Sequence, residues 1–560
     1  MNRENTRTIP SLGGLAKVAP AGIEWLVLAF LLFCAWQARA PLAPIPFGDP
    51  DTWGYINPAL SWLSGQGFQQ TNGRDWLYPG LVTLFLKTTG SFAGVFYWQQ
   101  ALGYLAIILM AVTWRIWVSF FDFSPWVRLI LTLAGAIPIW MQGVNPQLIF
   151  LESALRPESV MQFFGYAQLA CLLAYCWCRW KQPHALLAVL AAAGALFFAY
   201  ACLLLKPSWL FAFLATIAPI FVGIVGKGLP LRARLIGPAL GVLLCGVFLW
   251  LPPELWFVKD KRSRTFLPST LFTIHSRLIE KKLTADAAAM PAGDPEKARL
   301  ETLLTELRSE MHVAETMQHN YEKLGFNPDY LFYRSHFMIS LYNYAGGDPE
   351  KFRSYCIRLY LTTALTNPAG MANKVLTQMS HVLLPSGSTF YRADLVWKRI
   401  AKSTGSSFGM DVVDDYTPQV QEMCRVYLDQ AAAMTQHLPK LHRSKVGRDW
   451  AKIATRLNIP TMILFIVAFG VVLVRPPLAP YRLAAWGAMI LFSAPMGNAL
   501  TVSLVHALDI QRYRISLGGF LLFALTAMAG FVLVVAAHYL RPVAWKYLQP
   551  LVRKYLPTRS

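Results

Sequence analysis

Long apolar segments and short polar breaks alternate along most of this 560-residue chain. A helix needs about 20 apolar residues to cross a bilayer, and ten segments approach or exceed that length once their flanks are included. They lie near Ile23–Gln37, Phe96–Trp114, Trp126–Met141, Val160–Cys178, Ala185–Leu205, Trp209–Val225, Ile236–Leu251, Pro460–Val474, Leu483–Val505 and Ile515–Leu540. The pattern predicts an all-α protein, a polytopic membrane helix bundle with about ten spans.

Residues 252–455 interrupt this pattern, because they are charged, broken by Gly and Pro, and contain no long apolar run. Asp294-Pro295 and Asp348-Pro349 each place Asp at a helix N-cap and Pro at the first helical position. The sequence therefore predicts a helical extracytoplasmic domain at 252–455. An N-terminal transmembrane module (1–251) precedes this domain, and C-terminal spans with a basic tail (456–560) follow it.

Basic residues gather in short clusters beside the apolar segments. With 55% hydrophobic and 14% charged residues, the chain is too apolar for an ordinary soluble protein, so its net charge of +21 indicates anionic lipid as a partner and not nucleic acid. These clusters fall in every second connection between spans and in the C-terminal tail, and therefore on one side of the membrane. Their residues are Arg115, Arg179, Lys181, Lys227, Arg232, Arg234, Arg475, Arg482, Arg541, Lys546, Arg553 and Lys554. By the positive-inside rule both termini are expected in the cytoplasm, with the protein in a bacterial inner (plasma) membrane.

The first apolar segment is expected to remain as an anchor. Ala38-Arg39-Ala40 has the small-x-small form of a signal-peptide cleavage site, but Pro41 follows it directly and further spans come later. Of the eight cysteines, only Cys356 and Cys424 lie in the polar region. In an oxidising compartment these two are expected either to pair or to remain as buried free thiols.

The loop after the first span carries the candidate chemistry. Asp49 and Asp51 stand one residue apart, a Gly65-Gln66-Gly67 break follows, and then come Arg74 and Tyr78-Pro79. An isolated pair of acids in a Gly-Pro turn can simply face water. The order of acids, short helix, Gly break, Arg and Tyr-Pro, however, resembles the first extracytoplasmic loop of the GT-C superfamily of lipid-dependent glycosyltransferases. The resemblance covers residues 20–252 and 460–540.

Polar clusters recur at four later points on the predicted outer face. Arg156, in Arg156-Pro157-Glu158, can be read simply as an Arg at the membrane interface instead of a ligand-binding residue. Lys206 can likewise be read as a Lys whose ammonium group snorkels to the membrane surface. The basic run 259–264 is harder to explain by anchoring, because it opposes the positive-inside rule, and it indicates an anionic ligand. The charged triplet at 156–158 and the pair Arg512-Tyr513 before the last span again resemble GT-C sequences.

The resemblance implies an inverting membrane glycosyltransferase whose donor is a sugar on a polyprenyl phosphate or diphosphate. The acceptor would be a hydroxyl of a glycan, lipid or protein, reached from the periplasm. Asp49 or Asp51 would act as the general base, and cations would stabilise the departing lipid phosphate. The residues expected at the phosphate are Arg156, Lys206, Arg262, Arg264 and Arg512. Those expected at the acceptor or sugar are Tyr55, Arg74, Glu158, His275 and Tyr513.

Some members of the superfamily use a divalent cation between such acids and the phosphate. Asp49 and Asp51 would offer the oxygen ligands that suit Mg²⁺, Mn²⁺ or Ca²⁺, although two acids alone do not establish an ion. No Gly-rich phosphate loop is present, which agrees with a donor other than a nucleotide sugar.

Two other functions stay open. An oligosaccharide ligase or polymerase would rely on outer-face residues such as Arg264 and His275, and it would keep its activity without Asp49 and Asp51. A transporter or flippase would place charges inside its spans and often show inverted repeats, whereas here nearly all charges lie at span ends.

Overall fold

Ten helical segments long and apolar enough to cross a membrane form the body of the described chain. The computed structural model describes residues 12–48, 51–69, 74–226, 228–256, 266–317, 324–383, 414–436, 445–505 and 510–555. Within these ranges every named element is a helix, and one isolated β-bridge is present. The prediction of an all-α polytopic bundle with about ten spans is confirmed, and the ten apolar helices indicate a multi-pass membrane protein.

The spanning helices coincide with the predicted spans and extend beyond them at their ends. They are α1 (Leu12–Arg39), α4 (Phe92–Val118), α5 (Pro125–Val144), α7 (Glu158–Cys176) with the π-helical turn Trp177–Lys181, α8 (Ala185–Leu205), the 3-10 turn Pro207–Trp209 with α9 (Leu210–Val225), α10 (Leu231–Cys245) with the π-helical turn Gly246–Trp250 and α11 (Leu251–Trp256), α22 (Lys445–Val474), the 3-10 turn Pro476–Tyr481 with α23 (Arg482–Val505), and α24 (Ile510–Tyr555).

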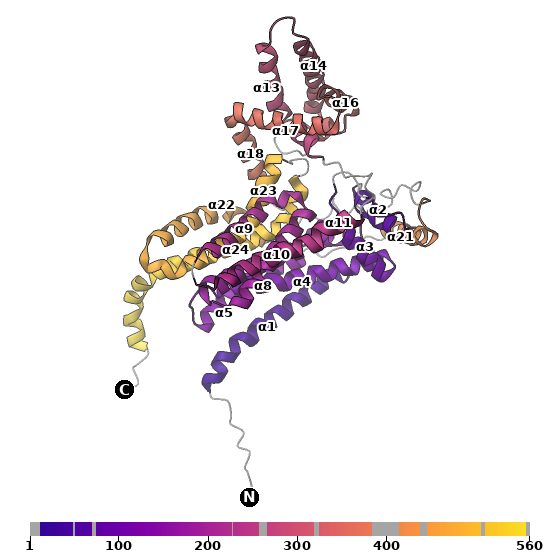
Figure 1. The fold of residues 1–560 in the computed structure, drawn as a ribbon. Helices are drawn as coiled ribbons and strands as arrows, with labels where there is room; N and C mark the ends of the chain where they lie inside the picture. Colours follow the sequence, from indigo (N-terminus) through magenta and orange to yellow (C-terminus); the bar gives the residue numbers. More distant parts are fainter. Residues whose placement is uncertain are drawn as a thin grey trace.

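The shorter helices lie at one end of the bundle, opposite the end where α1 begins and α24 ends (Figure 1). They are α2 (Thr52–Leu63), α3 (Leu77–Thr89), α6 (Pro146–Ser153), α12 (Leu267–Ile274), α13 (Ser276–Ala289), α14 (Pro295–Thr316), α15 (Pro328–Tyr333), α16 (Ser335–Tyr344), α17 (Pro349–Thr366), α18 (Pro368–Leu383) and α21 (Pro418–Gln436). The loops between α4 and α5, α7 and α8, and α9 and α10 fall at the other end. Which end faces the cytoplasm stays a prediction from the basic residues in those loops.

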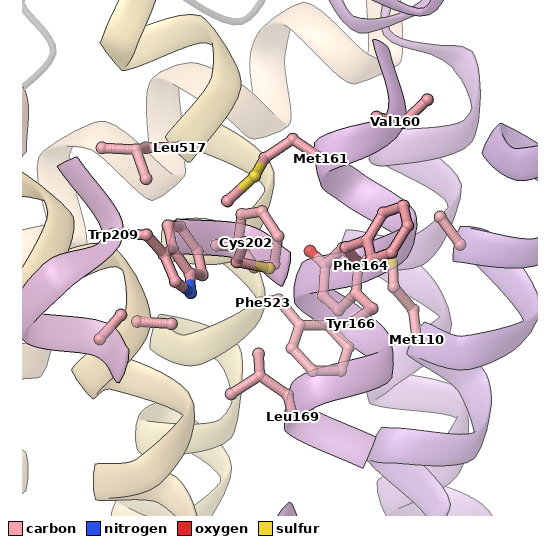
Figure 2. Packing of buried hydrophobic residues seen from close by; sticks show 14 of the residues in the cluster. Met110, Val160, Met161, Phe164, Tyr166, Leu169, Cys202, Trp209, Leu517 and Phe523 are labelled. Carbon is pink, nitrogen blue, oxygen red and sulfur yellow. The ribbon is translucent and has the colours of Figure 1, made fainter. Parts of the chain in front are cut away.

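Helix α7 lies in the middle of the bundle, and 83% of its spanning window is buried. Figure 2 shows its Phe164 and Tyr166 among side chains from neighbouring helices, including Phe523 of α24. The Tyr166 ring also stacks on Phe520, with 4.4 Å between centroids. Because α7 is surrounded by protein on most sides, the residues at its first turn have a fixed position.

Some of the polar groups inside the bundle bind one another. Trp209 Nε1 donates a hydrogen bond of 2.7 Å to Gln168 Oε1, and Gln168 Nε2 donates one of 2.6 Å to Thr216 Oγ1. Hydrocarbon offers no water to a polar group, so pairing within the protein avoids an unsatisfied donor or acceptor.

A second hydrophobic core is built from α12 to α17, with Leu307 and Phe337 fully buried in it. Two of its helices begin as the sequence predicts. Asp294 accepts a hydrogen bond of 2.8 Å from Glu296 N at the start of α14, and Asp348 caps α17 in the same way. By contrast, α21 and the end of α18 contribute to the core of the bundle, and Tyr427 of α21 donates a hydrogen bond to Pro46 O.

Every cysteine of the described chain is a free thiol, so the predicted Cys356–Cys424 disulfide is wrong. The alternative of two buried thiols holds instead. Cys356 lies in α17 within the second core, whereas Cys424 lies in α21 within the core of the bundle. Two residues packed in separate cores cannot approach to bonding distance.

The end of α1 is fixed by an ion pair between Arg39 and Glu152 of α6. Arg39 Nε lies 2.9 Å from Glu152 Oε2 and Arg39 Nη2 lies 3.0 Å from Glu152 Oε1, and each side chain is only 4% exposed. Arg39 Nη1 also donates to Gly143 O at 2.6 Å, near the end of α5. Burial raises the pKa of the Glu152 carboxyl, and Arg39 opposes that shift. One guanidinium thus joins α1, α5 and α6.

We expect Arg39→Met to destabilise the protein by about 3–5 kcal/mol, because it leaves the Glu152 charge buried without a partner. Arg39→Met/Glu152→Leu should recover most of that loss, since it removes both charges. Thermal unfolding of the purified protein in detergent measures the change. Arg299→Ala, which breaks the exposed Arg299–Glu296 pair, is the control and should cost less than about 1 kcal/mol. Equal losses for the single and double variants would contradict this role of the ion pair.

Candidate functional site

The loop after α1 is joined to the segment before α7 by main-chain hydrogen bonds. Phe47 N donates to Ser153 O at 2.7 Å, and Leu155 N donates to Phe47 O at 2.8 Å. These bonds form a parallel bridge between Phe47 and Ala154. Residues about a hundred positions apart in the chain therefore lie side by side.

Asp51 lies just beyond this bridge, directly before α2. Asp at such a position commonly caps a helix, but the Asp51 side chain makes no capping hydrogen bond. Its Oδ1 lies 3.1 Å from Arg74 Nη2, and its Oδ2 lies 3.1 Å from Arg156 Nη2. The Asp51 side chain is 34% exposed, so a molecule arriving from solvent can reach the carboxylate between the two guanidinium groups.

Aromatic rings hold Arg74 in place. Its guanidinium carbon lies 4.7 Å from the centroid of the Tyr55 ring and 5.9 Å from that of Phe266. The Tyr55 ring in turn packs edge-on against Tyr78, with 5.5 Å between centroids. A cation over an aromatic face is attracted by the ring quadrupole, so Tyr55 of α2 helps to aim Arg74 at Asp51.

A buried hydrogen-bond network holds the backbone of Arg156. Gln99 Nε2 lies 2.9 Å from Tyr78 Oη and 2.8 Å from Ser159 Oγ, and Ser159 Oγ donates to Arg156 O at 2.6 Å. Burial raises the pKa of the Tyr78 hydroxyl, which favours its protonated form. Gln99 was not among the predicted site residues, although a polar residue in a predicted span is a signal of such a network.

A second ion pair lies at the first turn of α7. Lys206 Nζ is 3.0 Å from Glu158 Oε1, and the two side chains are 8% and 2% exposed. Lys206 Nζ also lies 4.2 Å from the centroid of the Tyr513 ring of α24. Three residues predicted for the site thus meet, and only Pro157 separates Glu158 from Arg156 in the chain. The Arg-Pro-Glu triplet at 156–158 contributes to both ion-pair clusters.

The remaining predicted site residues are placed elsewhere or not described. Asp49, Arg262 and Arg264 lie outside the described residues, and only the backbone of Arg512 is described, within α24. His275 is buried between α12 and α13, where its Nδ1 lies 2.8 Å from Leu271 O. Burial lowers the pKa of the His275 imidazole, and the ring lines a separate cavity.

Asp75 follows Arg74 in the chain and was not among the predicted site residues. Burial raises its pKa from the usual 3.8 to about 6. Within the described ranges no side chain forms an ion pair with Asp75. A carboxyl with a raised pKa next in sequence to a predicted site residue is a further candidate for proton transfer.

The described residues do not fit a divalent cation at Asp51. Both carboxylate oxygens lie within 3.1 Å of a guanidinium group, and these two cations would repel a third. No group of three or more His, Cys, Asp or Glu side chains suited to a metal occurs in the described part of the chain. The predicted Mg²⁺, Mn²⁺ or Ca²⁺ ion at Asp49 and Asp51 stays a prediction, because Asp49 lies outside the described residues.

The fold and the site define a multi-pass membrane protein with paired charged groups at one end of its helix bundle. Comparisons with protein-family models, with curated proteins and with solved structures gave no match to this chain. The resemblance to the GT-C superfamily therefore stays a prediction from the sequence.

We expect Asp75→Asn to stabilise the protein by about 1–3 kcal/mol above pH 6. Because the folded state raises the Asp75 pKa, it binds a proton more tightly than the unfolded chain, and stability falls as the pH rises from about 4 to about 6. The benefit of the Asn side chain should vanish below about pH 4, where Asp75 is neutral in both states. Thermal unfolding measured across this pH range tests the sign of the change in stability.

Asp429→Asn, at an exposed position of α21, is the matched control for the chemical change from Asp to Asn. Parallel pH profiles for the wild-type protein and the Asp75→Asn variant would contradict a raised pKa for Asp75.

Proposed function

We propose that this chain is an integral membrane glycosyltransferase of the GT-C type. It transfers a sugar from a polyprenyl phosphate or diphosphate to a hydroxyl acceptor, with inversion at the anomeric carbon. One observation carries the proposal: the accessible Asp51 carboxylate lies between Arg74 and Arg156 at the end of a ten-helix bundle. This arrangement supplies a base for the acceptor and cations for the donor phosphate within one cluster.

Asp51 is the general base of the proposed reaction. The acceptor oxygen attacks the anomeric carbon while one Asp51 carboxylate oxygen takes the hydroxyl proton. The bond between the anomeric carbon and the phosphate oxygen breaks, and its electron pair leaves with the lipid phosphate. A new carbon–oxygen bond forms to the acceptor. The exposure of Asp51 supports this role, because the acceptor has to reach the carboxylate.

Arg74 and Arg156 stabilise the leaving phosphate. Negative charge builds on the phosphate as its bond to the sugar breaks, and fixed cations nearby lower the energy of that state. A guanidinium has five N–H donors in a planar fork, so Arg156 can hold Asp51 through Nη2 and a phosphate oxygen through another nitrogen. The side chain of Arg156 is 11% exposed, and partial burial strengthens its attraction for an anion.

Lys206 and Glu158 have a different role in this proposal from the one that the sequence suggested. They neutralise each other in a buried pair, and this pair connects the start of α7 with the end of α8. We assign them to positioning Arg156, which lies two residues before Glu158. Tyr513 packs on the Lys206 ammonium group and adds α24 to the same support.

The position of the Asp51 cluster supports a donor that arrives within the bilayer. The cluster lies at the end of the spanning helices that also carries α2, α3 and the second core, away from the basic loops that predict the cytoplasmic side (Figure 1). On this proposal the site faces the periplasm of a bacterial inner membrane. The acceptor is a glycan, a lipid or a protein.

Asp51→Asn should lower the rate of sugar transfer by about 10²- to 10⁴-fold, because it removes the base and keeps the shape of the side chain. Transfer from a panel of polyprenyl-phosphate-linked sugars by the purified protein measures the loss. Expression and lipid binding should stay near the wild-type level, and Asp429→Asn should retain full activity. Full turnover by Asp51→Asn would overturn the assignment and favour a ligase that relies on Arg264 and His275.

Arg156→Ala should raise the donor concentration needed for half-maximal rate and also lower the turnover. Arg156→Lys should restore only part of the activity, because it keeps the charge and loses the bidentate fork. Kinetics at varied donor concentration separate the two effects. Arg308→Ala changes an exposed Arg paired with Glu280 and is the control. Identical donor dependence for wild type and Arg156→Ala would place the phosphate elsewhere.

A further inference from the structure

A cavity of about 420 Å³ lies between α13 of the second core and α18. Helix α18 contacts α23 and α24, so the cavity is at the place where the second core meets the bundle (Figure 1). Its size is in the range of sites for small molecules. It shares no lining residue with the Asp51 cluster.

Two helices present polar faces to this cavity. Arg277 and Lys281 are one turn apart on α13, and Lys374 and Gln378 are one turn apart on α18. Residues four positions apart share one face of a helix, so each helix directs a pair of polar side chains at the same space. His275, at the start of α13, also lines the cavity, and its burial lowers the pKa of the imidazole and favours the neutral form.

The charges that line the cavity are all positive. No Asp or Glu is among its lining residues in the described part of the chain. Arg277 pairs with Glu315 at 2.7 Å, whereas Lys374 Nζ donates a hydrogen bond of 2.6 Å to the neutral Ser503 O. Burial lowers the pKa of Lys374 to about 7, which is the effect of holding an ammonium group away from water without an opposite charge.

Gln378 gives a second and independent indication of a ligand. Its side chain is only 1% exposed, and neither its amide oxygen nor its amide nitrogen has a hydrogen-bond partner in the described structure. A buried polar group left in this state costs about 1–3 kcal/mol, so such groups are normally satisfied. A rotation of the Gln378 side chain would bring its amide nitrogen to a ligand oxygen in the cavity.

We propose that this cavity binds a phosphate group, with Lys281 and Lys374 supplying charge and Gln378 donating a hydrogen bond to a phosphate oxygen. A phosphate offers several acceptor oxygens and a double negative charge, which matches two ammonium groups and an amide on facing helices. The phosphate belongs either to a soluble phosphorylated molecule or to a lipid headgroup. This site is independent of the proposed transfer of sugar at Asp51.

Isothermal titration calorimetry on the full-length protein in detergent tests the proposal, with inorganic phosphate as one probe and dihexanoyl phosphatidic acid as the other. The wild type should bind at least one probe, and Lys374→Gln, Lys281→Gln and Gln378→Leu should each weaken binding about tenfold or more. Binding of inorganic phosphate indicates a soluble ligand, and binding of the lipid probe alone indicates a headgroup. Because Lys281 is exposed, its variant tests the site with little effect on folding.

Lys282→Gln is the matched control, since Lys282 is also on α13 but pairs with Asp286 and does not line the cavity. Its affinity should equal that of the wild type. Arg156→Ala removes the phosphate contact proposed at the Asp51 cluster, and binding at this cavity should persist in that variant. The proposal is overturned if neither probe binds, or if Arg156→Ala abolishes binding while Lys374→Gln and Lys281→Gln do not.

Discussion

The buried ion pair between Arg39 and Glu152 is the contact on which the rest of the site depends. It fixes the end of α1 against α6, and the next residues of each segment then meet in the backbone bridge between Phe47 and Ala154. That bridge brings Asp51 and Arg156 together. A charged pair at this depth is costly to form, because both ions lose their hydration. Its value to the fold is therefore the position that it imposes on the two loops.

Beyond Asp51, a second buried ion pair continues the charged cluster toward α8 and α24. Glu158 lies next to Lys206, and Tyr513 packs on that Lys, so no bulk water is needed to satisfy the ions. Each ion pair joins residues from different segments of the chain. The charged end of the bundle is consequently held together by electrostatics across segments, while the middle of the bundle is held by packed apolar side chains such as Tyr166 and Phe523.

The features that could be predicted from the sequence are those whose interacting residues lie close together in the chain. The spans and the Asp294 and Asp348 caps depend on neighbouring residues, so the sequence pattern predicts them well. The partners of Asp51 depend on how distant segments fold together, and for that reason Arg74 was assigned to the acceptor although it contacts the carboxylate. The prediction that Cys424 lies in the polar domain with Cys356 was wrong for the same reason. Its helix looks like part of the polar insert, yet α21 packs on the bundle.

The two guanidinium groups at Asp51 also bear on the order of events in the proposed reaction. A carboxylate that accepts hydrogen bonds from Arg74 and Arg156 is a weaker acceptor for a third donor than one in a neutral setting. A lipid phosphate beside these Arg side chains competes for their N–H groups, and the competition releases lone pairs on Asp51 for the acceptor hydroxyl. Donor binding would thus prepare the base before the acceptor arrives.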